Sequence, residues 1–547
     1  MLALAAALAV VSCDREPLGE PSPRIREVLG EGGPAVVELP TGDTLHLSET
    51  VAAFYRDRGY RQAWTDYDEV LDRGLALIET MGRSTEDGFS PEAYRYALAA
   101  RMVMEVEEDS LEEAEEPGQM AEVDLVLSEV FSRYASHLAG GALDPKSAGL
   151  DWQIKREEPD VRALLEALVA DATPAALVDS LRPPAPEYRR MMAMLARYRN
   201  IEQAGGWAEI PEADPFEVGD TADAVAVLRN RLVAERDPVE SALAARGSAA
   251  PRLFDESLRE AVAHFQARHG LDPDGALGEH TLAELNTSVD RRIAEIELNM
   301  DRWRWLPREL GDLYVMVNVA GFELEVVERD SALLTMNVVV GKDAWRTPIF
   351  RDTMEYVVVN PYWNAPASIA TDEIIPALRA DPSYLERNRF EVLQGDRPVS
   401  VSEIDWTGDV AQRYRFRQRP GPGNALGDVK FLFPNPDDIY LHDTPAAHLF
   451  SQSSRAFSHG CIRVEKPVEL ARLIFAKATD RSPDSYDDLR ARGGEQWVPL
   501  TKPVPVYILY FTAYAHRDGT VSFHPDIYER DRRLEEQAGT TSKKSAQ

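Results

Sequence analysis

The sequence predicts a multidomain α+β protein, with helices in the first half of the chain and strands in its last third. At 547 residues the chain is too long for one comfortable domain. Up to about residue 204, apolar side chains recur at three- and four-residue spacings, which is typical of amphipathic helices. From Leu313 onward, apolar and polar residues alternate, which indicates strands. These patterns place a helical region ahead of a β-rich, sandwich-like domain.

Composition narrows the class of protein and of partner. With 44% hydrophobic and 28% charged residues, the chain has the make-up of an ordinary soluble globular protein. Its formal net charge is −33, and its sequence pI is about 4.8. Such a charge argues against nucleic acid as a partner and against electrostatic binding to anionic membrane surfaces.

Residues 1–13 are predicted to be a lipoprotein-type signal peptide. An apolar run ends at Ser12-Cys13 and is too short to span a membrane. Val10 to Cys13 resembles a lipobox, in which the signal is cut before the cysteine and the cysteine is lipidated. Cys13 is therefore the expected lipidation site and the only membrane attachment. No Lys or Arg precedes the run, so an ordinary secretory signal with an incidental cysteine is the alternative.

This signal predicts a place in the cell envelope, on the periplasmic side. Asp14 follows the cysteine, which favours the inner membrane and leaves the outer membrane open. Pro- and Gly-rich stretches then predict a flexible tether over residues 14–47. Residues 48–213 are predicted to form a helical scaffold domain.

Residues 214–289 are predicted to form a small three-helix domain. Glycines at 270, 275 and 278 mark turns between helices, and Phe265 and Leu282 are candidate core residues. The pattern around Phe265-Gln266, His269-Gly270 and Asp274-Gly275 resembles a peptidoglycan-binding domain. His264, His269 and His280 are assigned to surface or turn positions in preference to a metal site.

The remaining chain is divided into three predicted parts. Residues 290–310 form a linker helix, and residues 311–515 form the β-rich domain. An insertion at about 371–425 interrupts its strands with a helix at 372–379 and a basic run (Arg413, Arg415, Arg417 and Arg419). These arginines are assigned either to carboxylate binding or to a neutralising surface patch. Residues 516–547 are expected to be a partly disordered C-terminal extension.

The stretch from Tyr440 to Val464 holds the candidate chemistry. Cys461 is the only cysteine after Cys13, and His442 lies nineteen positions before it. Alternation of apolar and polar residues predicts a strand that ends near His442. A neighbouring imidazole can take the proton of a thiol, and the resulting thiolate is the nucleophile. Gly460 lets its backbone approach a substrate closely, and nearby amides could stabilise an oxyanion.

Two other interpretations of this stretch remain open. A lone cysteine is often a small buried hydrophobic residue. Alternatively, His442, His459 and Cys461 could hold a catalytic zinc ion. No HExxH, paired CxxC or acidic ligand at a telling interval accompanies them, which disfavours the metal.

His442, sixteen intervening residues and then Ser458-His459-Gly460-Cys461-Ile462-Arg463 resembles the signature of the L,D-transpeptidases, with their YkuD-type catalytic domain. The domain order resembles that of the large subgroup with a helical scaffold, a peptidoglycan-binding domain and a capping insertion. The resemblance implies that Cys461 is the nucleophile and that His442 is the general base. The carbonyl of Asp443 would orient His442, and the amides of His459, Gly460 and Cys461 would line an oxyanion hole. Implied substrate-binding residues are Arg463, Ser458, Trp363 and Tyr362.

The implied reaction is a cysteine acyl transfer in cell-wall biogenesis and remodelling. Cys461 would attack the third residue of a donor peptidoglycan stem peptide, expel the terminal D-alanine and pass the acyl group to an acceptor stem, giving a 3-3 cross-link. Carbapenem-type inhibitors would acylate the same thiol, and no cofactor or metal is needed. Water, a free D-amino acid or an envelope protein as acceptor, a non-catalytic wall-binding scaffold and a metal-dependent peptidase are the alternatives.

Overall fold

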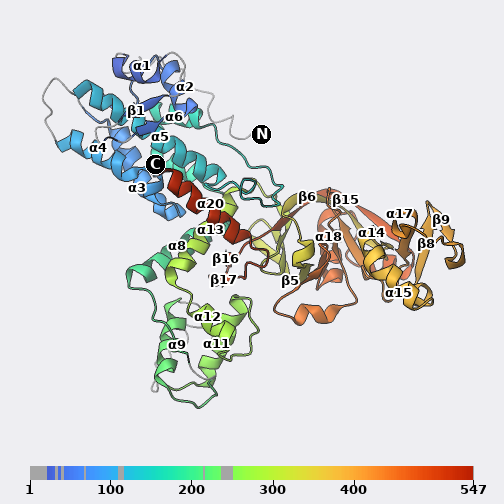
Figure 1. Ribbon diagram of the computed structural model, residues 1–547. Coiled ribbons are helices and arrows are strands. Elements are labelled where there is room, and N and C mark those ends of the chain that lie inside the picture. The colour runs from blue at the N-terminus through green and yellow to red at the C-terminus, as the bar shows by residue number, and fades with distance from the viewer. Residues whose placement is uncertain are drawn as a thin grey trace.

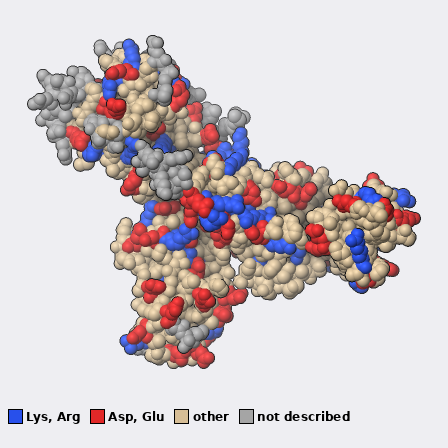
Figure 2. Space-filling model, viewed as in Figure 1, with Lys and Arg blue, Asp and Glu red and all other residues tan. Residues whose placement is uncertain are grey.

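The computed structural model describes residues 21–30, 35–38, 42, 44–66, 69–108, 116–212, 216–235 and 251–545. Three lobes meet near the middle of the molecule: a helical N-terminal lobe, a three-helix lobe and a β lobe that continues into the insertion (Figure 1). On the face drawn in Figure 2, acidic and basic side chains are interspersed over all three lobes. The multidomain α+β class is confirmed. The signal peptide and Cys13 lie outside the described residues, and none of the described helices is both long and apolar enough to span a membrane.

The N-terminal lobe is organised around the long helix α5 (Glu116–Gly140). Its side chains at Leu125, Phe131 and Leu138 are fully buried in one apolar core. The helices that pack on it are α1 (Pro23–Leu29), α2 (Glu49–Asp57), α3 (Asp72–Gly82), α4 (Tyr96–Glu108), α6 (Val161–Val169) and α7 (Pro174–Leu181).

The predicted flexible tether is wrong over the part that the structure describes. Helix α1 and the paired strands β1 (Val36–Glu38) and β2 (Thr44–His46) belong to this lobe. Ile25 and Val37 are completely buried in its core. The apolar residues between the prolines and glycines therefore contribute packing energy, and the segment is folded.

The three-helix lobe consists of α9 (Asp223–Ala234), α11 (Glu256–Arg268) and α12 (Glu279–Leu285). Val225, Leu228, Val262 and Phe265 are completely buried in its core. His269 lies in the turn that ends α11, as predicted, but its side chain is buried instead of exposed. Its ring stacks on Phe265, with 3.8 Å between centroids, and lies 5.6 Å from the ring of Phe523. The contact with Phe523 attaches this lobe to the C-terminal part of the chain.

The predicted linker helix is a central element. Helix α13 (Val289–Arg304) packs along α8 (Pro186–Gln203) and carries buried Trp303 and Arg304. It joins all three lobes because it follows the three-helix lobe directly and precedes the first strand of the β lobe (Figure 1).

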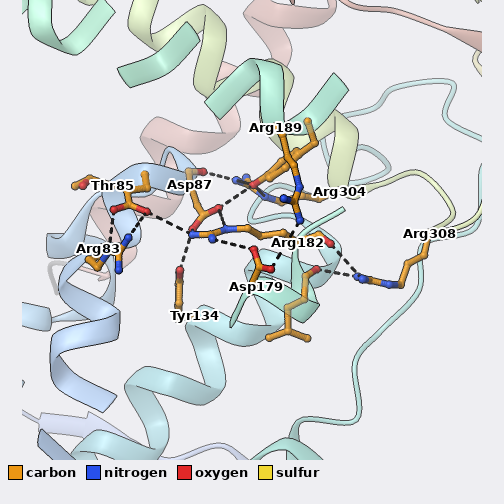
Figure 3. A network of polar contacts seen from close by, with 12 residues as sticks. Arg83, Thr85, Asp87, Tyr134, Asp179, Arg182, Arg189, Arg304 and Arg308 are labelled. Atoms are coloured by element: carbon orange, nitrogen blue, oxygen red, sulfur yellow. Dashed lines mark hydrogen bonds and ion pairs between the residues drawn. The ribbon is translucent and has the colours of Figure 1, made fainter. Parts of the chain in front are cut away.

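A buried polar network connects α13 to the N-terminal lobe (Figure 3). The carboxylate of Asp87 accepts two hydrogen bonds from Arg182, both 2.8 Å, and one from Tyr134 at 3.0 Å. Arg304 of α13 donates to the backbone carbonyl of Asp87 and to the hydroxyl of Tyr188, the latter at 2.7 Å. Asp87 is completely buried, and Arg304 is 3% exposed. Such a network is stable only while each charge keeps its partners.

The β lobe is one nine-stranded sheet in the order β13-β5-β14-β12-β11-β6-β15-β3-β4. A further pairing of β4 with β5 joins the two halves of this order into a ring. Helices α18 (Pro467–Ala478) and α19 (Ser485–Ala491) complete its core. The strands are β3 (Leu313–Asn318), β4 (Glu323–Glu328), β5 (Ser331–Gly341), β6 (Phe350–Val359), β11 (Val429–Leu432), β12 (Leu441–His442), β13 (Ala456–Ser458), β14 (Ile462–Val464) and β15 (Gln496–Leu509).

The insertion is a small unit with its own sheet and core. Its sheet has the order β7-β10-β8-β9, and Ile374, Val392 and Phe416 are buried in its core. Its strands and helices are β7 (Trp363–Asn364), α14 (Ala367–Ile369), a π-helical turn (Ala370–Ile374), α15 (Ile375–Ala380), α16 (Tyr384–Arg387), β8 (Phe390–Gln394), β9 (Arg397–Val399), α17 (Val410–Arg413) and β10 (Arg415–Gln418).

The arginine run of the insertion is neutralised by its own neighbours. Arg413 pairs with Asp405 at 2.6 Å, and Arg415 pairs with Asp396 at 3.2 Å. Arg417 and Arg419 both face Glu391, at 3.2 and 3.7 Å. These ion pairs favour the surface-patch assignment over carboxylate binding.

The C-terminal extension is folded over residues 516–545, the part that the structure describes, so the expected disorder is wrong there. The hairpin of β16 (Ala513–Ala515) and β17 (Val521–Phe523) packs near α13 and α8, and α20 (Arg530–Ser545) follows it. Tyr528 is completely buried, and Arg530 is 1% exposed. These residues are buried because the extension returns to the centre of the molecule, where α20 lies beside the other lobes (Figure 1).

Candidate active site

Two neighbouring strands bring the thiol and the imidazole together. Strands β12 and β14 are parallel, with Leu441 opposite Ile462 and His442 opposite Arg463. The amide of Ile462 donates to the carbonyl of Tyr440 at 3.1 Å. Leu441 and Ile462 are completely buried in the core of the β lobe. Because side chains alternate along a strand, Tyr440, His442, Cys461 and Arg463 face the opposite side of the sheet.

On that side lies a pocket of about 250 Å³. The insertion forms one wall, and the ends of the strands with the loop before Cys461 form the other. Its lining residues are Trp363, Pro366, Ile369, Glu373, Ala425, Leu426, Tyr440, His442, Ser458, His459, Cys461 and Arg463.

His442 is held as a neutral imidazole. Its Nδ1 lies 2.6 Å from the backbone carbonyl of Asp443, the position that the predicted orienting role requires. Because a carbonyl only accepts, Nδ1 carries the proton and Nε2 keeps its lone pair. Burial, together with the nearby charges of Arg463 and Lys430, lowers the pKa of His442 to about 3, although the hydrogen bond to the Asp443 carbonyl acts in the opposite direction.

Cys461 is a half-buried, protonated thiol. Burial raises its pKa to about 11, while hydrogen bonds with Tyr440 act in the opposite direction. The Sγ atom lies 3.6 Å from the carbonyl of Asp438 and donates to it. Among the contacts of the described residues, no hydrogen bond joins Cys461 to His442. In this state the two groups share a pocket as a neutral thiol and a neutral imidazole.

Tyr440 is a site residue that sequence reasoning missed. It stands two positions before His442 on the same face of the strand, and its ring centroid lies 5.6 Å from the imidazole. Burial and the contact with Cys461 raise the pKa of Tyr440, and its hydrogen bond lowers the pKa of the thiol. The two-residue spacing from a strand-end histidine was the available signal.

The loop before the cysteine is held by its own serine. Ser458 is 2% exposed, and its Oγ donates to the carbonyl of Cys461 at 2.6 Å. The amide of Gly460 donates to the same Oγ at 3.1 Å. Two expectations change as a result: the Ser458 hydroxyl serves the loop instead of a substrate, and the Gly460 amide is engaged within the loop. The amides of Cys461 and His459 remain the candidate oxyanion donors.

The same loop rests on residues far away in the sequence. Thr347 is completely buried, and its Oγ1 donates to the carbonyl of Gly460 at 2.8 Å and accepts from the amide of Gly341 at 3.0 Å. A side chain on Gly341 would collide with the backbone at Trp345 and would lie 3.1 Å from the Cα of Gly460. Tyr528 of the C-terminal extension donates to the carbonyl of Gly341. The loop that carries Cys461 is therefore supported from the C-terminal extension.

His459 connects the loop to the insertion through its side chain. Its Nε2 lies 3.2 Å from the carboxylate of Glu373, which belongs to the π-helical turn. The imidazole of His459 also contacts the indole of Trp345, with 4.6 Å between the ring centroids. Sequence reasoning assigned only the backbone amide of His459, so this link was not predicted.

Of the predicted substrate-binding residues, Arg463 and Trp363 line the pocket and Tyr362 does not. Arg463 lines the pocket, and its Nε has no hydrogen-bond partner among the described residues. Trp363 also lines the pocket and packs on Phe390. Tyr362 is not among the lining residues, because adjacent residues on an extended segment point to opposite sides. Its ring lies 4.3 Å from the guanidinium of Arg417 instead.

No group of three metal-ligating side chains that could hold an ion occurs in the part of the chain that the structure describes. His442, His459 and Cys461 therefore do not converge as zinc ligands, although they line one pocket.

Comparison with known families agrees with the pocket chemistry. Residues 312–481 match the L,D-transpeptidase catalytic domain, the YkuD family. The chain carries an L,D-transpeptidase catalytic domain. Residues 49–195 match the scaffold domain, and residues 235–285 match a putative peptidoglycan binding domain.

A curated relative supports the same assignment. The chain is 34% identical over 251 residues to a putative L,D-transpeptidase of Haemophilus influenzae, a match that covers 45% of this chain and 50% of the relative. The chain thus spans half the length of this relative. The transpeptidase domain assignment rests on these sequence matches.

Two solved structures were also compared with this chain. An L,D-transpeptidase from Mycobacterium smegmatis is 15% identical, with 36% of this chain and 58% of that chain covered and a TM-score of 0.18. One from Stackebrandtia nassauensis is 13% identical, with 54% and 97% covered and a TM-score of 0.21. Scores this low add nothing to the transpeptidase domain assignment.

Proposed function

We propose that this chain is a peptidoglycan L,D-transpeptidase that forms 3-3 cross-links between stem peptides through a thioester on Cys461. The observation that carries the proposal is that His442 on β12 and Cys461, directly before the parallel strand β14, line one pocket, with the Asp443 carbonyl holding His442 Nδ1. That arrangement leaves Nε2 of His442 free to accept the thiol proton.

The first half-reaction transfers the donor acyl group to the protein. The sulfur of Cys461 attacks the carbonyl carbon of the third stem residue while its proton passes to His442 Nε2. The tetrahedral intermediate collapses, the C–N bond to the terminal D-alanine breaks, and the proton moves from His442 to the departing amine. The oxyanion is stabilised by the amides of Cys461 and His459.

The second half-reaction reverses these roles. An amine of the acceptor stem attacks the thioester carbonyl, His442 takes the proton from that amine, and the thiolate leaves and is reprotonated. Arg463, whose Nε is unpartnered among the described residues, supplies a charge for a stem carboxylate at the pocket wall. Trp363 closes the pocket on the side of the insertion.

The domain order supports action at the cell wall. We propose that residues 48–213, joined by the folded segments α1, β1 and β2, are a scaffold domain, that residues 214–289 bind peptidoglycan, and that residues 311–515 with the insertion are the catalytic domain. The protein is proposed to act on the periplasmic side of the envelope, anchored by lipid on Cys13.

The test is intact mass spectrometry of the chain without residues 1–13, after mixing with a carbapenem. The β-lactam ring opens on the thiol, so the expected product is one adduct with the full mass of the carbapenem on the wild type. We expect no adduct on Cys461→Ala and at least a hundredfold slower acylation of His442→Ala, because loss of the general base removes its contribution. Residues 21–47 are retained, because they contribute to the core of the N-terminal lobe.

Muropeptide analysis then identifies the acceptor. A dimer joined through the third residues of both stems is the expected product, with D-alanine released in equal amount. Hydrolysis of the thioester or exchange of D-alanine would replace the cross-linking proposal with another acceptor. Robust turnover by Cys461→Ala would end the cysteine mechanism.

A further inference from the structure

A row of side chains extends from the candidate active site across the outer face of the sheet. In the strand registers, His442 pairs with Lys430, Lys430 with Val358, and Val358 with Trp497. Directly paired residues on neighbouring strands point to the same face. Their chain neighbours Leu441, Phe431, Val357 and Val498 lie in the core on the other face. Trp497 therefore shares the face of His442, three strands away.

Trp497 is exposed and held in one orientation. It is 51% exposed, the largest exposed fraction of any aromatic residue in the described part of the chain. Its Nε1 donates to Glu495 at 3.0 Å, and the ring of Tyr356 meets it edge-on with centroids 5.6 Å apart. An indole that is both exposed and fixed in this way offers a flat apolar face to a ligand.

Charged groups lie beside the indole. Lys430 Nζ is 5.5 Å from the ring centroid and 4.0 Å from the carboxylate of Glu495. The same oxygen of Glu495, Oε1, accepts from the amide of Tyr362 at the base of the insertion, at 3.0 Å, whereas Oε2 accepts from Trp497. Together Trp497, Tyr356, Lys430 and Glu495, named here the outer strip, present an apolar ring surrounded by polar groups.

The length of the row matches the length of a donor stem. Three strand spacings of about 4.8 Å place Trp497 roughly 14 Å from His442. Three extended residues between the reacting carbonyl and the first stem residue cover about 10 Å, and the lactyl link to the sugar adds about 4 Å. A donor stem that lies across the strands would bring its amino sugar to Trp497.

We propose that the outer strip binds the amino-sugar ring that carries the donor stem. The C–H face of the ring stacks on Trp497, and Lys430 and Glu495 hydrogen-bond the hydroxyl and acetamido groups at its edge. The strip thus recognises the glycan part of the substrate, whereas the pocket at Cys461 recognises the peptide. This inference rests on the proposed function, because it takes the donor stem as the pocket's ligand.

The test compares two ligands in the Cys461→Ala background, where no turnover is needed. Calorimetry measures the Kd of a disaccharide tetrapeptide and of the same tetrapeptide without sugar. We expect the sugar to tighten binding about tenfold, the affinity that stacking on one indole supplies. Adding Trp497→Ala should bring the two Kd values together, and Trp497→Phe should keep part of the difference.

The control is a second exposed apolar side chain that lies outside the outer strip. Leu333→Ala removes another exposed apolar side chain, at the far end of β5, and should leave the tenfold ratio intact. The proposal is overturned if Trp497→Ala keeps the ratio, or if it weakens both ligands equally, since the strip would then contact the peptide. With Cys461 restored, Leu333→Ala should react with a carbapenem at the wild-type rate, whereas failure of the proposed function would show as no adduct on the wild type.

Discussion

At the scale of single residues, the free site holds a neutral pair instead of an ion pair. Burial moves the pKa of Cys461 up to about 11 and that of His442 down to about 3. Between these two values the thiol keeps its proton and the imidazole has none. The thiolate must then form during attack, when a substrate carbonyl can take up the charge. A protected thiol of this kind is also slow to oxidise.

This pair makes a pH prediction for the free protein. Only the thiolate reacts with iodoacetamide, and its fraction rises about tenfold per pH unit below the thiol pKa. We expect the alkylation rate of Cys461 to climb from pH 7 to pH 10 without a plateau, measured by intact mass. The raised pKa gives the sign: reactivity is low at neutral pH and is gained as pH rises.

Cys461→Ala is the control, and it should give no adduct at any pH. A rate that is already constant near pH 7 would mean that a thiolate–imidazolium pair exists before substrate binds, contrary to the neutral pair.

Site residues could be predicted from the sequence where a short motif or strand alternation specifies them. Cys461 and His442 were found because a short motif specifies them. Tyr440 could have been found from strand alternation, because it is two positions from His442. The engagement of Ser458 could not, since only the loop conformation shows that its Oγ faces Cys461 O instead of the pocket.

At the scale of elements, the loop before Cys461 depends on a brace from the segment between β5 and β6. Thr347 bonds both Gly460 and Gly341, and all of these groups are buried. Two orphaned backbone groups would be left if its hydroxyl were lost, at a cost of about 1–3 kcal/mol each. Loss of these hydrogen bonds would allow the loop to move and would displace Cys461, which follows Gly460 in the chain.

We therefore expect Thr347→Val to remain folded but to react at least tenfold more slowly with a carbapenem. The measurement is the rate of adduct formation, with circular dichroism melting as the check on folding. Thr335→Val, at an exposed position of β5, should react at the wild-type rate. Equal rates for both variants in folded protein would show that the brace does not position the thiol.

The insertion shows why element contacts resist prediction from sequence. Its place in the chain and its basic run were visible, but the partners of the arginines were not. Asp396 meets Arg415, and Glu391 meets Arg417, only because β8 and β10 pair in one register. Because the strand register is not visible in the sequence, the sequence alone could not decide whether these arginines neutralise the surface or bind a ligand.

At the scale of the whole molecule, the lobes are joined through Asp87. Its carboxylate neutralises Arg182, and its backbone binds Arg304 from the central helix (Figure 3). Removing one member of a buried charge network costs about 3–5 kcal/mol, because the partner stays buried without compensation.

Asp87→Ala should therefore lower the free energy of unfolding by about that amount, measured by urea denaturation. Asp179→Ala is the matched control: Asp179 also contacts Arg182, at 3.4 Å, but is 55% exposed, so its loss should cost under about 1 kcal/mol. Equal midpoints for the two variants would show that the Asp87 network does not hold the lobes together.

The order of the domains was predictable, because each has its own periodicity, but their contacts were not. Residues 21–47 were assigned to a tether on Pro and Gly content, yet Ile25 and Val37 are core residues of the first lobe. Local composition cannot show which apolar residues find a distant partner. The same reason explains the extension at 516–547, whose Tyr528 packs against residues almost two hundred positions earlier.

That last contact has a consequence for the making of the protein. A ribosome adds Cys461 well before Tyr528 and Arg530, so the nucleophile exists during synthesis without the residues that support its loop. A chain that stops early, through a nonsense codon or a stalled message, carries the whole signature yet lacks the support. We therefore expect a product that ends before Tyr528 to react more slowly with a carbapenem than the full chain, because its Cys461 loop lacks this support.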